Sequence, residues 1–296
     1  MKSLLLLAAV ATFATALSAA TRSVPSQYAT IQAAVDAAAS GDTIAIANGT
    51  YNEQVTIASS KTGLKLVGAS QTGVKLRAGA GQKPLNIAGA DTTVSYMTIE
   101  NTAGETAGQQ NAVYVTGKRV EFYRCYINGW QDTFAIWNGA LVYCKYCEIR
   151  GSVDFIYSGG TAFFETTNIR QIRSTGGPAT APSTPPEVTY GFVFSGCTFN
   201  RSSNVANNSS TFMRPWREYG QTVLINCTVD AHITAAGWSP WDGREATCRA
   251  AEYGSKTLSG TTINLSTRSS WVKRLSSTEA ATYSRSNVLG GWMPPL

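Results

Sequence analysis

The chain has 296 residues, of which only 14% are charged while 27 are glycine, and its formal net charge is +6. Abundant Gly, Thr, Ser and Asn favour strands and turns over helices, so we expect an all-β fold. The positive charge would attract a polyanion, either a nucleic acid or an acidic extracellular polysaccharide. The N-terminal segment, described next, favours the extracellular polysaccharide, and we expect no nucleic-acid partner.

The segment 1–19 is typical of a secretory signal. Lys2 precedes an apolar run from Leu4 to Ala16, and small residues up to Ala19 suit a signal peptidase. This run is shorter than the roughly 20 residues of a membrane-spanning helix. We therefore predict a secreted, extracellular protein that is not attached to a membrane. N-glycosylation sequons, which predict a glycoprotein if the source is a eukaryote, begin at positions that include Asn48, Asn200, Asn207, Asn226 and Asn264.

A helix is expected near the start of the mature chain, residues 20–296, which we interpret as one domain. In the segment 30–39 the apolar residues follow a helical period, and Gly41 would end the helix. Such a helix would cap the open end of a stack of repeats. A strand is expected to follow over residues 43–47. The stretch Gly176–Pro186 is expected to be a long surface loop.

The middle of the chain contains an internal repeat. The segment 120–134 aligns without a gap on the segment 142–156, so that Asp132 meets Asp154. Short segments with alternating apolar residues, repeated at a period of about 22 residues, predict a single-stranded parallel β-helix in which each repeat is one coil. A β-propeller or a β-sandwich is the alternative.

Cysteine recurs at one position of the repeat. Cys125 and Cys147 are one period apart, and the same short phrase returns at Cys197 and Cys227. Residues one coil apart are close enough for the disulfides Cys125–Cys147 and Cys197–Cys227. The alternative is that these cysteines are small buried hydrophobic residues. No zinc site is expected at Cys144 and Cys147, because no further CxxC pair or suitable histidine accompanies them.

The reactive side chains available are carboxylates and amides. The only histidine, His232, is expected at the surface or the core edge, and no Gly-x-Ser-x-Gly, HExxH or phosphate-binding loop is present. Gln109 lies one period before Gln131, as Asp132 does before Asp154, so these four side chains should form one polar patch. Two stacked carboxylates repel each other, which favours a functional role over simple turn-forming aspartates.

Six short phrases give the sequence a resemblance to a known family. They are Gly49-Thr-Tyr-Asn-Glu53, Asn101-Thr-Ala-Gly104 with Gln109, Gln131-Asp-Thr-Phe134, Gly151-Ser-Val-Asp-Phe-Ile-Tyr157, Arg214-Pro-Trp216 and Gly237-Trp238. In this order, from about Ser23 to the Trp238 region, the chain resembles the pectin methylesterases, or pectinesterases. Several phrases in the right order are far more specific than any one of them.

This resemblance implies a right-handed parallel β-helix that hydrolyses methyl esters of homogalacturonan (pectin) to pectate and methanol, with no metal or cofactor. It places the nucleophile at Asp154 and the general acid at Asp132, so the intermediate would be an aspartyl acyl-enzyme. Gln109 and Gln131 would donate hydrogen bonds to the oxyanion. Arg214, beside Asp154, would keep that carboxylate ionised.

Aromatic side chains are the expected contacts to the sugar rings, with core packing as the alternative for each. The candidates are Trp216, Trp238, Phe155, Tyr51 and Phe134. Three phrases depart from the family's usual pattern. Phe212-Met213 replaces Leu-Gly before Arg214, Tyr157-Ser158 replaces Phe-Gly, and Gln110-Asn111 replaces small apolar residues.

We expect a monomer. The rival interpretations are a polygalacturonase, a pectate lyase, which would need a calcium site, and a non-catalytic polysaccharide-binding solenoid.

Overall fold

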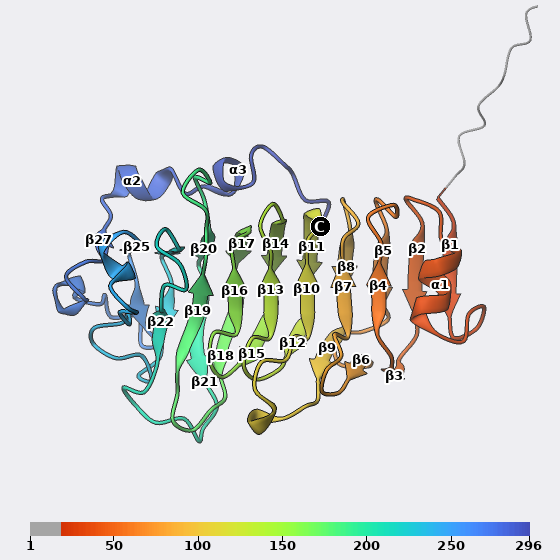
Figure 1. The fold of residues 1–296 in the computed structure, drawn as a ribbon, viewed down its shortest axis with the longest axis horizontal. Helices are drawn as coiled ribbons and strands as arrows, with labels where there is room; N and C mark the ends of the chain where they lie inside the picture. Colours follow the sequence, from red (N-terminus) through yellow and green to blue (C-terminus); the bar gives the residue numbers. More distant parts are fainter. Residues whose placement is uncertain (1–18) are drawn as a thin grey trace, which may run out of the picture.

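The computed structural model describes residues 19–296, and the predicted secretory signal lies outside this range except for its last residue. Three parallel sheets run the length of the molecule, and the chain visits them in turn, so that each circuit forms one coil of a parallel β-helix (Figure 1). The predicted fold class is confirmed, and the propeller and sandwich alternatives are excluded.

The largest sheet has eleven strands. In spatial order they are β1 (Thr21–Val24), β2 (Thr43–Ile46), β5 (Lys65–Gly68), β8 (Thr93–Ser95), β11 (Lys118–Tyr123), β14 (Leu141–Lys145), β17 (Thr161–Glu165), β20 (Phe192–Ser195), β23 (Gln221–Ile225), β25 (Arg249–Tyr253) and β27 (Lys273–Arg274). The strand expected over residues 43–47 is β2. Strand β1 precedes it and was not anticipated.

The other two sheets complete each coil. The nine-stranded sheet contains β3 (Gly49–Asn52), β6 (Val74–Ala78), β9 (Thr98–Asn101), β12 (Tyr126–Asn128), β15 (Glu148–Gly151), β18 (Asn168–Gln171), β21 (Thr198–Arg201), β24 (Thr228–Val229) and β26 (Lys256–Thr257). The seven-stranded sheet contains β4 (Val55–Ile57), β7 (Leu85–Ile87), β10 (Val113–Val115), β13 (Phe134–Ile136), β16 (Ile156–Ser158), β19 (Pro178–Pro182) and β22 (Thr211–Met213).

Strand register confirms the predicted repeat. Each sheet pairs two residues that the sequence places one period apart: Val120 with Val142, Ile127 with Ile149, and Phe134 with Ile156. These six side chains are fully buried in one continuous core. The period of the sequence is therefore the length of one coil, and residues one period apart lie in the same place on consecutive coils.

Short helices lie at the two ends of the chain. Helix α1 (Ile31–Ala37) begins after the N-cap Thr30, buries Ile31, Ala34 and Val35, and lies beside β1 and β2 at the N-terminal end of the solenoid (Figure 1). The helix expected here is present, and its capping role stays a prediction. Helices α2 (Ser277–Ala281) and α3 (Arg285–Val288) carry Ala280 and Val288, which pack on the outer face of the eleven-stranded sheet. No helix among residues 19–296 has the length and apolar character needed to cross a bilayer.

The prediction of a surface loop over Gly176–Pro186 is wrong in its central part. Residues Pro178–Pro182 form β19, which is almost entirely buried and pairs with β16 on one side and β22 on the other. Proline is tolerated at the ends of this strand because it lacks only the N–H donor. The Pro178 carbonyl still accepts a hydrogen bond from the Asp154 amide at 2.8 Å.

All six cysteines are free, so neither anticipated disulfide is present. Five of them are buried, and Cys248 is half-buried. The Cys147 thiol contacts the amide of Cys125 and the carbonyl of Phe122, each at 3.4 Å. The alternative prediction, small hydrophobic residues that fill the core, is the one that the structure supports.

Candidate active site

Asp132 and Asp154 occupy the same turn in consecutive coils, where the chain leaves the nine-stranded sheet for the seven-stranded one. Each lies two residues before a strand, β13 or β16, and both have left-handed backbone conformations, with φ of 61° and 52°. The Asp132 amide donates to the Val153 carbonyl at 3.2 Å, which ties one turn to the next. The left-handed conformation costs an L-residue roughly 1–2 kcal/mol, so the surrounding coils must hold both turns in place.

Arg214 forms an ion pair with Asp154. Its Nε lies 2.9 Å from Oδ1 and its Nη2 lies 2.5 Å from Oδ2, which is a bidentate arrangement. The Asp154 side chain is only 8% exposed, so the interaction is largely shielded from water. The indole ring of Trp241 covers the guanidinium, with its centroid 4.1 Å from Cζ. Arg214 is therefore fixed from two sides, by a carboxylate and by an aromatic ring.

The two carboxyl groups differ in their electrostatic surroundings. Burial, and then repulsion by Asp154, raise the pKa of Asp132 to about 7, although Arg214 and Gln131 act in the opposite direction. Burial also raises the pKa of Asp154, but the hydrogen bonds and charge of Arg214 oppose this. Within residues 19–296, only Asp154 of the two forms an ion pair. The arrangement can therefore hold one carboxyl group ionised beside one that keeps its proton near neutral pH.

Gln109 and Gln131 are brought together as the repeat predicts. Their backbones form an isolated parallel bridge, and the amide of the next residue, Gln110, donates to the Gln131 carbonyl at 3.1 Å. The Gln109 side chain is exposed and that of Gln131 is half-buried. Gln131 directly precedes Asp132 in the chain, and Gln109 has the equivalent position one coil earlier.

Three polar or aromatic residues of the site were not predicted. The Asn111 amide donates to the Asp132 carbonyl at 2.6 Å and to the Tyr157 hydroxyl at 3.0 Å. Trp241 covers Arg214. Asn111 and Tyr157 are two of the departures from the family's usual phrases, and this was the available signal. Trp241 gave no signal beyond its closeness in sequence to Trp238.

Two of the five aromatic candidates are partly accessible. Trp216 lies after β22, and its ring centroid is 6.0 Å from that of Tyr157 on β16. Tyr51 lies on β3, near the N-terminal end of the solenoid, and its hydroxyl donates to the Ala47 carbonyl at 2.8 Å. Trp216 is linked to the aspartate pair through the chain, since it lies two residues after Arg214, which binds Asp154.

The other three aromatic candidates are in the core, so their assignment as sugar contacts is corrected. Phe134, Phe155 and Trp238 are 0%, 1% and 2% exposed. Phe134 packs edge-to-face on Phe122, with ring centroids 5.3 Å apart. These side chains point into the core, away from any ligand on the outer surface.

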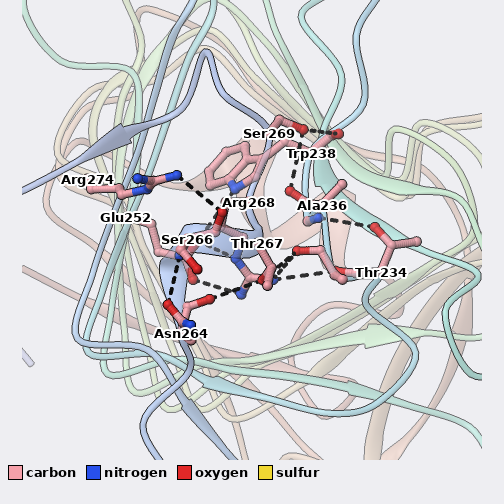
Figure 2. A network of polar contacts seen from close by, with 12 residues as sticks. Thr234, Ala236, Trp238, Glu252, Asn264, Ser266, Thr267, Arg268, Ser269 and Arg274 are labelled. Atoms are coloured by element: carbon pink, nitrogen blue, oxygen red, sulfur yellow. Dashed lines mark hydrogen bonds and ion pairs between the residues drawn. The ribbon is translucent and has the colours of Figure 1, made fainter.

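A buried ion pair explains the position of Trp238. The indole Nε1 lies 3.4 Å from Oε2 of Glu252, and the Glu252 carboxylate also accepts hydrogen bonds from Arg268 at 2.8 and 3.0 Å (Figure 2). Glu252 and Arg268 are 0% and 6% exposed. Trp238 therefore packs in the core of the C-terminal coils, beside the ion pair of Glu252 and Arg268.

His232 is buried rather than at the surface. It is 2% exposed, and burial lowers its pKa to about 4, so that it is uncharged at neutral pH. Its charged neighbours are Asp230 and Arg201. Among residues 19–296, no three His, Cys, Asp or Glu side chains are grouped so that they could hold a metal ion.

The Pectinesterase family model matches residues 19–291. The chain belongs to the pectinesterase family. Probable pectinesterase/pectinesterase inhibitor 58 of Arabidopsis thaliana is 28% identical over 91% of this chain, and the match covers 51% of the relative. The chain thus spans about half the length of that relative.

Solved structures of pectinesterases have the same fold. A pectin methylesterase crystallised with a hexasaccharide has a TM-score of 0.80 and 27% identity, covering 96% of this chain and 100% of that chain. The enzyme from carrot has a TM-score of 0.85 and 26% identity, covering 93% of each chain. The right-handed parallel β-helix implied by the family resemblance is confirmed.

Proposed function

We propose that this pectinesterase-family chain is a pectin methylesterase, which hydrolyses methyl esters of homogalacturonan to pectate and methanol through an aspartyl acyl-enzyme. The observation that carries the proposal is the asymmetry of the aspartate pair. Arg214 binds Asp154 through both Nε and Nη2, whereas Asp132 is buried and has a pKa of about 7. This asymmetry supports an ionised Asp154 as the nucleophile and a protonated Asp132 as the general acid.

In the first step, an oxygen of ionised Asp154 attacks the C6 carbonyl carbon of a methyl-esterified galacturonate. A carboxylate is a weak nucleophile, so stabilisation of the oxyanion must lower the barrier. The side-chain amides of Gln109 and Gln131 are the proposed donors. The C–O bond to the methoxy group then breaks, Asp132 gives its proton to that oxygen, and methanol leaves.

In the second step, water cleaves the acyl-enzyme. Asp132, now ionised, takes a proton from the water molecule while the oxygen of that water bonds to C6. The bond from C6 to the Asp154 oxygen breaks, which releases the galacturonate carboxyl group and restores the Asp154 carboxylate. Asp132 is left protonated for the next cycle, so the pair returns to its starting state without any further reagent.

The outer face of the seven-stranded sheet is the proposed surface for the polymer. Trp216 is the best placed of the predicted sugar contacts because it is partly accessible and lies beside Tyr157. Tyr51 is proposed as a more distant contact. The net charge of +6 favours a polyanionic partner, in keeping with pectin.

The setting of the enzyme is also a proposal. The sequence of residues 1–19 supports secretion to the extracellular space, where the enzyme would act as a monomer. Four of these sequon positions have an exposed asparagine, and they are Asn48, Asn207, Asn226 and Asn264. They are the proposed glycosylation sites in a eukaryotic source.

The test is an assay of methanol release from methyl-esterified pectin. The wild-type protein should release methanol without forming new reducing ends or unsaturated product, which separates it from a polygalacturonase and a lyase. Asp154→Ala and Asp132→Ala should each reduce the rate by at least about a thousandfold while circular dichroism stays unchanged. Full activity in either variant would refute the assignment, and binding without turnover in the wild type would favour a non-catalytic solenoid.

A further inference from the structure

The side chain of Asn111 joins its own coil to the next two at the aspartate turn. Its two amide hydrogens have different acceptors, the main-chain carbonyl of Asp132 at 2.6 Å and the hydroxyl of Tyr157 at 3.0 Å. Asp132 lies one coil further along the solenoid than Asn111, and Tyr157 lies two coils further. One amide group therefore links three consecutive coils.

Asn111 is itself held from below. The buried side chain of Asn101 donates to the Asn111 carbonyl at 2.9 Å and to the Gln82 carbonyl at the same distance. On either side of Asn111, the amides of Gln110 and Ala112 donate to the coil above. Because its backbone is tied at these points, the side chain of Asn111 is a fixed donor to Asp132 and Tyr157.

Asp132 needs such support. Its φ of 61° is unfavourable for a residue with a side chain, and its carboxyl group must be directed by the turn. The hydrogen bond from Asn111 is made to the main chain of that turn, so it fixes the direction of the carboxyl group without changing its charge directly.

The Tyr157 hydroxyl is able to donate a hydrogen bond to a ligand. The oxygen accepts from Asn111, and within residues 19–296 this hydroxyl donates no hydrogen bond to another group. Strand β16 buries Ile156 and Ser158, so the side chain between them points to the outer face of the sheet, where it is partly exposed. Its ring is flanked by Trp137 and Trp216, at centroid distances of 6.3 and 6.0 Å.

The neighbours of Tyr157 in the sheet are small. In strand register it lies between Ala135 and Ala181, both of which are buried. A sugar bound on this face could accept a hydrogen bond from the hydroxyl of the partly exposed Tyr157 while Asn111 donates to the same hydroxyl oxygen. The acceptor would be a sugar hydroxyl or a carboxyl oxygen, since both are present in galacturonan.

We propose that Asn111 is a positioning residue that aligns Asp132 and Tyr157 together, and that the Tyr157 hydroxyl donates a hydrogen bond to an oxygen of the bound polysaccharide. This inference rests on the proposed function of the aspartate pair. It adds Tyr157 as a residue that contacts the substrate. It also adds a link between Tyr157 and the proposed general acid Asp132, made by the two hydrogen bonds of Asn111.

The experiment is a double-mutant cycle on methyl-esterified oligogalacturonide, with methanol release as the readout. Tyr157→Phe should raise KM about three- to tenfold and leave kcat nearly unchanged, because it removes one hydrogen bond to the substrate. Asn111→Ala should lower kcat about tenfold and also raise KM, because it affects both partners. The loss of kcat/KM in the double variant should be smaller than the product of the single losses, since the two changes remove one shared interaction.

Tyr126→Phe is the matched control. Tyr126 lies on β12 of the nine-stranded sheet, away from the proposed surface for the polymer, and like Tyr157 it is partly exposed. Its substitution should leave KM and kcat unchanged. Thermal unfolding of every variant separates a local effect from loss of the fold, and Tyr157→Phe, which loses a single oxygen, keeps the test valid if Asn111→Ala does not fold.

The outcomes separate this inference from the proposed function. A wild-type protein that releases no methanol would refute the proposed function. An active wild type with an unchanged KM in Tyr157→Phe would overturn the substrate contact. Multiplicative losses in the double variant would overturn the link through Asn111.

Discussion

Asp132 and Asp154 have the same place in consecutive coils, and their different neighbours give them different properties. Arg214 is covered by Trp241 and forms hydrogen bonds and an ion pair with the second of them, Asp154. Asp132 has no ion pair of its own; burial and the Asp154 charge raise its pKa, and the more distant charge of Arg214 and a hydrogen bond from Gln131 only partly oppose this. At the residue scale, then, the proposed division of roles follows from a single arginine.

The pH dependence of activity should follow from this division. As a general acid, Asp132 must be protonated, and its pKa is about 7 because of burial and of Asp154. The rate of methanol release should therefore fall as the pH rises through about 7, since the proton is lost there. Initial rates measured from about pH 4 to about pH 9 test this expectation. A rate that stays constant up to the alkaline end would contradict the role of Asp132.

Arg214→Gln tests the acid limb of the same pH–activity profile. Arg214 opposes the rise in the pKa of Asp154 that burial causes. Without the guanidinium, this pKa should be higher, so Asp154 should be protonated at a higher pH and activity should be lost earlier on acidification. An unchanged acid limb would mean that another group controls it.

At the scale of elements, the turn between β15 and β16 depends on a close contact at Gly151. A Cβ at this position would overlap the side chain of Phe155 and would lie 2.8 Å from the Trp130 carbonyl. Gly151→Ala should lower the free energy of unfolding by about 2–3 kcal/mol, because the buried ring has no space to move. It should also reduce activity, since Phe155 is bonded to Asp154.

Gly79→Ala is the matched control for this substitution. The nearest atom to its added Cβ is Oγ1 of Thr102, at 4.0 Å. Its free energy of unfolding should change by less than about 1 kcal/mol. Urea denaturation of both variants measures the difference, and equal stabilities would contradict the role of close packing in the Gly151 turn.

The elements also explain what the sequence could predict. Register is periodic, so the spacing of Asp132 and Asp154 was enough to predict that the two turns are stacked. The burial of β19 and of Trp238 was not predictable in the same way. Proline content indicates a loop unless neighbouring strands satisfy its carbonyls, and the position of Trp238 depends on Glu252 and Arg268, which follow it in the chain.

Pairwise contacts between distant coils were also beyond sequence reasoning. The contact of Asn111 with Tyr157 spans 46 residues, or two coils, and although both residues depart from the family's usual phrases, nothing in the sequence pairs them. The stacking of Trp241 on Arg214 depends on a loop conformation that no periodic signal specifies. The fold and the stacking of the aspartate pair follow from repetition, whereas these further contacts depend on which side chains meet across different coils and loops.

For the whole molecule, the buried ion pair of Glu252 and Arg268 should be a major determinant of stability. Arg268→Ala would leave a fully buried carboxyl group without its cation, which should lower the free energy of unfolding by about 3–5 kcal/mol. Arg119→Ala is the control, because Arg119 and Asp91 form a pair that is 42% and 44% exposed. That substitution should cost less than about 1 kcal/mol. Equal losses in thermal unfolding experiments would contradict this explanation.

The cohesion of the solenoid should not depend on disulfides. All six cysteines are free, and five of them fill the interior as apolar side chains would. A reducing agent should therefore leave the melting temperature unchanged, although the chain is predicted to be exported to an oxidising compartment. A thiol reagent should modify half-buried Cys248 first and all six thiols only after denaturation. A fall in melting temperature on reduction would mean that the stacked cysteines are cross-linked and that coil stacking alone does not account for the stability of the fold.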